Sequence, residues 1–136
     1  MNTDQKPVRL LLVDDEVGYL EVLCKRLKKR DFDVATAYSG AEAIRAVRDR
    51  DFDVAVVDLK MEDMDGIELL KILKQMLPTL QVIMLTGHGS ERAARNGISL
   101  GAFDYLLKPI DLNALLERVL AAAGTEGVDV DDNGSA

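Results

Sequence analysis

The sequence lacks several features that mark common classes of protein. It has 136 residues and a single cysteine, Cys24, so it can form no internal disulfide framework. It has no tryptophan, and its 17 Lys and Arg residues are outnumbered by 24 Asp and Glu residues, which gives a net charge of −7. Without a basic stripe or an aromatic platform, we expect no direct binding to nucleic acid.

Long apolar runs are also missing. No run approaches the length of a bilayer-spanning helix, and the polar start at residues 1–6 is unlike a signal peptide. We therefore expect no membrane partner and predict a reduced, cytoplasmic location. Cys24 lies at helical spacing near Leu20, Leu23 and Leu27, and we interpret it as a small core residue rather than a reactive thiol.

Short apolar runs alternate along the chain with segments of helical periodicity. This alternation predicts an α/β fold with one five-stranded parallel sheet, covered by helices on both faces. The second and fifth strands are the most polar, so we place them at the edges. The expected strands are residues 9–13, 34–38, 54–58, 82–85 and 104–107, and the expected helices are residues 17–30, 41–50, 67–77, 90–100 and 112–123.

The length indicates one domain with a sizeable core. We assign this domain to residues 9–124, after an N-terminal extension at residues 1–8. Residues 125–136 carry four acids, two glycines and little apolar content, and we expect a disordered acidic tail or a linker stub there.

The stretch 53–66 organises the rest of the chain. An apolar, β-branched run ends abruptly at Asp58, and a polar turn leads to Gly66 and a helical pattern. This order places one carboxylate at the carboxyl end of a buried strand, where open α/β sheets have their binding sites. Asp14 and Asp15 follow the first strand, Thr86 follows the fourth and Lys108 follows the fifth, so we expect these side chains at the same edge of the sheet.

Three carboxylates at one edge repel each other, and at least one should have a raised pKa unless a cation lies among them. Oxygen ligands with room for water suit Mg²⁺, and the sequence has no His or Cys cluster for Zn²⁺. With a cation bound, Asp58 could attack phosphorus, because aspartate is an established nucleophile for phosphoryl groups. Lys108 could supply a positive charge to the product, and the Thr86 hydroxyl a hydrogen bond.

Taken in order, these motifs resemble the receiver domain of bacterial two-component response regulators, over nearly the whole folded part. The resemblance implies a flavodoxin-like, doubly wound sheet with the strand order 2-1-3-4-5. The residues that carry it are Asp14-Asp15, Asp58, Met61, Met64-Asp65-Gly66, Thr86-Gly87-His88-Gly89, Gly101-Ala102-Phe103-Asp104-Tyr105 and Lys108-Pro109.

The resemblance also implies roles for individual residues. Asp58 would accept a phosphoryl group from a sensor histidine kinase, and Lys108 would form an ion pair with it. Asp15 and Asp58 would bind Mg²⁺ (or Mn²⁺) directly, together with the backbone carbonyl of Lys60. Asp14 would act on the metal through water.

Thr86 and Tyr105 would form a switch pair: Thr86 would turn toward the phosphoryl group, and Tyr105 would rotate inward behind Thr86. The surface of the fourth helix, fifth strand and last helix would then signal to a downstream protein or to an output domain. Formation of a homodimer through the same surface is an alternative. We hypothesise that the side chains of Lys60 and His88 set the rate of dephosphorylation. The alternative is that both are ordinary exposed loop residues.

One position departs from the family pattern: Glu62 stands where the family usually has proline, and we expect a looser loop around the Lys60 carbonyl. Two other functions compete with a phosphorylated switch. An aspartate-nucleophile phosphatase would need a second Asp two residues after its first-strand nucleophile, which Asp14-Asp15 does not provide. An interaction domain that works without phosphate would not need the full set of Asp15, Asp58, Thr86 and Lys108.

Overall fold

The computed structural model describes residues 6–124, so the predictions for residues 1–5 and for a tail at 125–136 lie outside the described residues. Five strands alternate with five helices, as predicted. None of these helices combines the length and apolar character needed to cross a membrane. The elements are β1 (Arg9–Val13), α1 (Val17–Lys28), β2 (Asp33–Ala37), α2 (Gly40–Asp49), β3 (Val54–Asp58), α3 (Gly66–Met76), β4 (Gln81–Thr86), α4 (Glu91–Ser99), β5 (Asp104–Leu107) and α5 (Leu112–Ala123).

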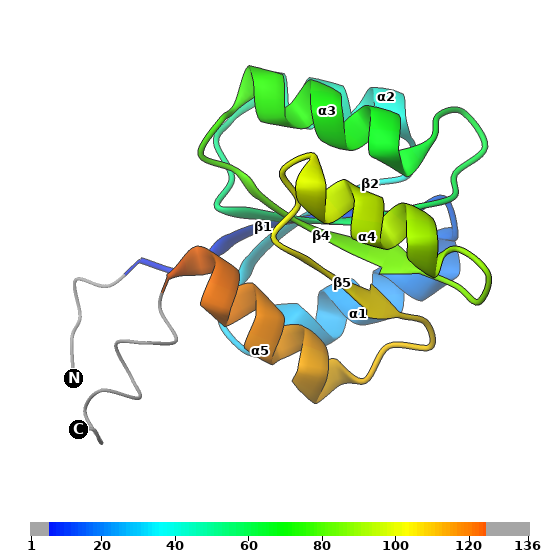
Figure 1. The fold of residues 1–136 in the computed structure, drawn as a ribbon. Coiled ribbons are helices and arrows are strands. Elements are labelled where there is room, and N and C mark those ends of the chain that lie inside the picture. Colours follow the sequence, from blue (N-terminus) through cyan, green and yellow to red (C-terminus); the bar gives the residue numbers. More distant parts are fainter. Residues whose placement is uncertain (1–5, 125–136) are drawn as a thin grey trace, which may run out of the picture.

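All five strands are parallel and form one sheet in the order β2-β1-β3-β4-β5. This order confirms the flavodoxin-like fold and the edge positions of β2 and β5. In Figure 1, α2 and α3 lie on one side of the sheet and α1 and α5 on the other, with α4 beside α3 and next to β5. Because the strands run in one direction, their carboxyl ends meet at a single edge.

Each central strand contributes to two separate cores, because successive side chains point to opposite faces of a strand. Leu11 and Val13 of β1 pack with α2 and α3, whereas Leu10 and Leu12 pack with α1 and α5. The strands β3 and β4 repeat this alternation, and their inner residues are almost fully buried. Burial on both faces explains why these strands are continuous apolar runs in the sequence.

Local capping sets several helix ends. The side chains of Asp65 and Asp111 accept backbone hydrogen bonds at the starts of α3 and α5. Helix α5 ends at Gly124, which has a left-handed φ of 81° that suits glycine. Helix α1 ends at Lys28 rather than at residue 30, because the chain turns there: Asp31 has a φ of 68° and donates its N–H to the carbonyl of Lys28.

Candidate functional site

The carboxylates of β1 and β3 meet at the carboxyl edge of the sheet. In the register of the two strands Val13 lies opposite Val57, so the residues that follow, Asp14 and Asp58, are neighbours. Asp14, Asp15 and Asp58 each offer one carboxylate oxygen, and these oxygens lie within 4.8 Å of one another. Asp14 is fully buried and Asp58 is 8% exposed. The sheet therefore brings together the three acids that the sequence predicts.

Lys108 brings a positive charge to this group from the end of β5. Its Nζ lies 3.0 Å from Asp14 Oδ2, 3.4 Å from Asp58 Oδ1 and 3.7 Å from Glu16 Oε1. It also lies 5.4 Å from the ring centroid of Tyr19 on α1. Neither Glu16 nor Tyr19 has a role predicted from the sequence. The run of three acids after β1 was the only signal for Glu16, and none was available for Tyr19.

Burial and the neighbouring charges shift the pKa values of Asp58 and Lys108. Burial raises the pKa of Asp58 above its ordinary value, and the charge of Asp14 raises it further; Lys108 and the backbone amide of Lys60 offset only part of the rise. Burial lowers the pKa of Lys108, but the hydrogen bond to Asp14 and the charge of Asp58 outweigh it, so the net pKa is raised. Burial, and after it the charge of Asp14, thus disfavours the ionised form of Asp58.

The two ends of the loop between β3 and α3, residues 59–65, are bonded to each other. Lys60 and Asp65 form an isolated antiparallel bridge, and the Gly66 N–H donates to the Leu59 carbonyl at 2.9 Å. A Cβ atom on Gly66 would lie 2.7 Å from the carbonyl oxygen of Asp58. Only glycine allows this approach, so Gly66 permits the chain to return directly beneath the nucleophile candidate.

The Glu62 position contacts the acidic group through its backbone. The Glu62 N–H donates a hydrogen bond to Asp15 Oδ2 at 3.0 Å, and proline at this position would have no N–H to donate. The expected loosening of the loop stays a prediction. The substitution nevertheless adds a direct tie between the loop and Asp15.

Thr86 and Tyr105 lie on the two strands beyond β3. Thr86 is fully buried and directly follows Leu85, the residue opposite Asp58 in the register of β3 and β4. Its hydroxyl donates to the carbonyl oxygen of Gly87 at 3.3 Å rather than to Asp58. Tyr105 is partly buried against the core formed with α2 and α3. Thr86 thus lies beside the strand end that carries Asp58, whereas Tyr105 lies one strand further out, opposite Met84. The switching of this pair stays a prediction.

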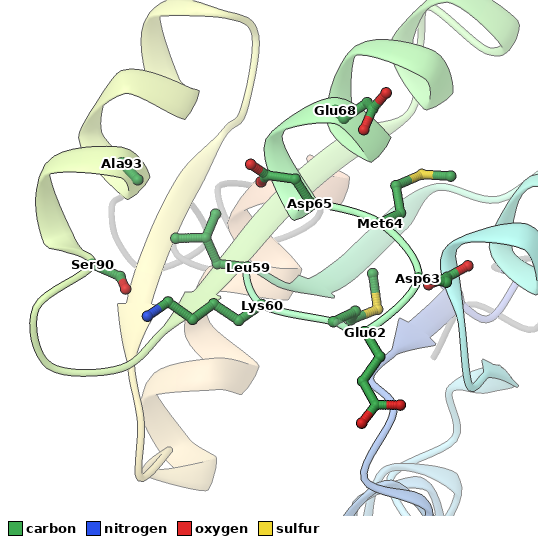
Figure 2. Close-up of a pocket in the computed structure, with 10 residues that line it drawn as sticks. Leu59, Lys60, Glu62, Asp63, Met64, Asp65, Glu68, Ser90 and Ala93 are labelled. Atoms are coloured by element: carbon green, nitrogen blue, oxygen red, sulfur yellow. The ribbon is translucent and has the colours of Figure 1, made fainter.

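Lys60 and His88 are both exposed. Figure 2 shows Lys60 on the wall of a cavity of about 590 Å³ between the loop and α4, with Ser90 and Ala93 on the opposite wall. A role for Lys60 and His88 in dephosphorylation stays a prediction.

Known proteins resemble this chain over most of its length. A family model for the response regulator receiver domain matches residues 10–120. Transcriptional regulatory protein GlrR of Escherichia coli (strain K12) is 40% identical over 114 residues, which are 84% of this chain and 26% of GlrR. Photosynthetic apparatus regulatory protein RegA of Cereibacter sphaeroides is 39% identical over 112 residues, 82% of this chain and 61% of RegA. The chain thus spans about a quarter of GlrR and less than two thirds of RegA.

Solved structures agree with the sequence comparisons. A response regulator receiver domain protein from Clostridium thermocellum superposes with a TM-score of 0.83 at 31% identity, covering 89% of this chain and 98% of that one. The receiver domain of NtrX from Brucella abortus superposes with a TM-score of 0.80 at 30% identity, covering 86% and 99% of the two chains. With the fold, the acidic group and these matches in agreement, the chain belongs to the response regulator receiver domain family.

Proposed function

We propose that this receiver domain accepts a phosphoryl group on Asp58 from a phosphohistidine of a sensor histidine kinase. The position of the Asp58 carboxylate carries the proposal. It is nearly buried, lies within 4.8 Å of carboxylate oxygens of Asp14 and Asp15, and lies 3.4 Å from the Lys108 ammonium. Such a nucleophile needs its surroundings neutralised before it can attack phosphorus. The kinase would act in the cytoplasm, where we place this chain as well.

The donor set suits a hard divalent cation. Asp15 and Asp58 would contribute carboxylate oxygens and Lys60 its backbone carbonyl, whereas Asp14 is already engaged by Lys108 and by the Glu16 amide and would act through water. The pKa of Asp58 is raised first by burial and then by the charge of Asp14, and a bound cation would favour the ionised carboxylate against both effects. Mg²⁺ or Mn²⁺ bound there would neutralise charge on the phosphoryl oxygens during transfer.

The chain's own groups account for the remaining chemistry. An Asp58 oxygen attacks phosphorus in line, the bond from phosphorus to the histidine nitrogen breaks, and its electron pair stays on the imidazole. The Lys108 ammonium then pairs with the new phosphoryl oxygens. The Thr86 hydroxyl leaves the Gly87 carbonyl and donates to the same group. The domain thus promotes phosphorylation of its own Asp58 and the later hydrolysis of that acyl phosphate. Apart from the phosphohistidine donor, it needs no other substrate.

The signal would leave through the surface formed by α4, β5 and α5. With Thr86 drawn toward Asp58, Tyr105 would turn into the space behind it and shift a population that already exists in the unphosphorylated protein. The relatives GlrR and RegA are longer regulators, so an output domain or a separate downstream protein would receive the signal. Alternatively, two phosphorylated copies would dimerise through the same surface.

Lys60 and His88 would set the lifetime of the phosphoryl group, because both are exposed and each lies two residues beyond a site residue, Asp58 or Thr86. Replacing each with alanine and following the loss of phosphate over time tests this role. Altered decay in either variant supports it, and unchanged decay in both contradicts it.

Intact-mass measurement after incubation with acetyl phosphate and Mg²⁺ tests the central step. We expect one added phosphoryl mass in the wild type and none in Asp58→Asn. Asp53→Asn is a matched control, because Asp53 precedes the same strand at its opposite end. Phosphorylation of Asp58→Asn at the wild-type level, or its loss in Asp53→Asn alone, would contradict the proposal.

A further inference from the structure

The loop of residues 59–65 has an attachment outside the acidic group. The Asp63 carboxylate accepts the N–H of Gly40 at 3.0 Å through Oδ1 and the N–H of Ala41 at 3.2 Å through Oδ2. These are the first two amides of α2, which has no intrahelical partner for them. Figure 2 shows Asp63 directed at the start of this helix, while Lys60 extends the other way, toward Ser90. One exposed side chain therefore joins the loop to α2.

Close packing strengthens this attachment. Gly40 has no side chain, and a Cβ atom there would lie 2.9 Å from the sulfur and 3.0 Å from the Cβ of Met64. The residue after Asp63 thus rests directly on the first residue of α2. The two ties, one polar and one apolar, act on adjacent residues of the loop and attach it to α2.

The loop is thus held between two partners. The Glu62 N–H donates to Asp15 Oδ2, and the neighbouring Asp63 accepts from the start of α2. The family usually places a proline at the Glu62 position, where it would restrict the loop internally. Here the restriction comes from α2 instead, through the residue next to Glu62.

We infer that Asp63 is a positioning residue: by binding the N-terminus of α2, it fixes the loop that presents the Lys60 carbonyl and the Glu62 amide to the cation site. The inference rests on the proposed function for the cation itself. Without Asp63, the loop keeps the bridge between Lys60 and Asp65 but loses its hydrogen bonds to α2. The carbonyl and the amide then fluctuate relative to Asp15, and a cation that demands a regular octahedron suffers most.

Cation binding to the unphosphorylated protein, measured by calorimetry, tests the inference. We expect Asp63→Ala to weaken Mg²⁺ binding by about tenfold, the low end of what partners that orient metal ligands contribute. Ca²⁺, which tolerates irregular geometry, should lose less. Asp63→Asn keeps an acceptor oxygen for α2 and should restore most of the Mg²⁺ affinity.

Two controls separate positioning from charge and from helix capping. Glu62→Ala removes a carboxylate from the same loop but keeps the amide, so it should weaken Mg²⁺ and Ca²⁺ equally and only slightly. Ser39→Ala removes the other cap of α2, which accepts the Glu42 N–H at 3.1 Å, and should lower the melting temperature without changing Mg²⁺ affinity. Equal Mg²⁺ losses in Asp63→Ala and Glu62→Ala would overturn the inference.

A readout without metal distinguishes failure of this inference from failure of the proposed function. If the wild type binds no Mg²⁺, the proposed cation site is wrong, and amide exchange in the metal-free protein decides the role of Asp63. We expect the Glu62 N–H to exchange with water faster in Asp63→Ala than in the wild type or in Ser39→Ala, as followed by NMR. Unchanged exchange would overturn the inference.

Discussion

The two ends of β3 carry an aspartate each, and the two aspartates have opposite surroundings. Asp53, just before the strand, is matched by one arginine: it accepts the backbone N–H of Arg9 at 2.8 Å, the Nε–H at 3.2 Å and the Nη2–H at 2.9 Å. Asp58, at the other end, shares the ammonium of Lys108 with Asp14 and Glu16. One end of the strand is balanced in charge and the other is not.

The pKa directions follow this difference. The hydrogen bond from Arg9 lowers the pKa of Asp53, despite a partial opposing effect of burial. Burial and the charge of Asp14 raise the pKa of Asp58. The comparison teaches that an ion pair alone does not indicate a functional site. Buried carboxylates that outnumber the nearby cations do indicate one, because their uncompensated charge favours binding of a cation, which in turn can accommodate a phosphoryl group.

The largest contrast should come from removing the cation at each end. Lys108→Ala leaves the fully buried Asp14 without its ammonium, and we expect the free energy of unfolding to fall by about 2–3 kcal/mol, less than for a fully buried pair because Lys108 is 24% exposed. Arg9→Ala, at the exposed end, should cost clearly less. Urea denaturation without divalent ions measures both. Equal losses would remove the distinction between the two ends.

A smaller contrast should appear in the pH dependence of stability without divalent ions. The folded-state pKa of Asp53 is lowered, so its stabilisation is present above the usual value of 3.8 and is lost as the pH falls through the folded pKa. The folded-state pKa of Asp58 is raised, so its penalty is absent below 3.8 and grows as the pH rises through the folded pKa.

Asp53→Asn should therefore lower the melting temperature at pH 7, and Asp58→Asn should raise it. The Asp58→Asn difference from the wild type should shrink as the pH falls toward 3.8, whereas the Asp53→Asn difference should persist down to 3.8 and shrink only below it. Thermal melting at several pH values checks this. Shifts of the same sign in the two variants at pH 7 would show that the surroundings of the two aspartates do not differ as described.

The smallest effect should come from the second ion pair at the balanced end, between Arg50 and Asp33. Their nitrogen and oxygen lie 3.1 Å apart, but the side chains are 42% and 48% exposed. We expect Arg50→Ala to change the free energy of unfolding by about 0.5 kcal/mol or less from this pair, plus the lost stacking on Phe52. A loss as large as that of Lys108→Ala would contradict the ranking.

The sequence predicted the features that depend on local pattern. The apolar runs of β1, β3 and β4 identified buried strands, and the acids directly after them identified the site edge. Asp111 and Gly124 likewise marked the ends of α5 by their own chemistry.

The features that it missed depend on contacts between distant parts of the chain. Asp63 binds amides 22 and 23 residues away, and Lys108 reaches Glu16 and the ring of Tyr19 on α1. Nothing local distinguishes these residues from ordinary surface acids or a core tyrosine. They became visible only when the register of the sheet brought the segments together.

The dependence of melting temperature on Mg²⁺, compared between the wild type and Asp58→Asn, tests most directly whether the carboxyl edge holds negative charge that a cation relieves. Without Mg²⁺ we expect the variant to be the more stable protein. Added Mg²⁺ should raise the melting temperature of the wild type much more than that of the variant, so that the difference narrows or reverses. A difference that stays constant at every Mg²⁺ concentration would contradict a cation site formed with Asp58.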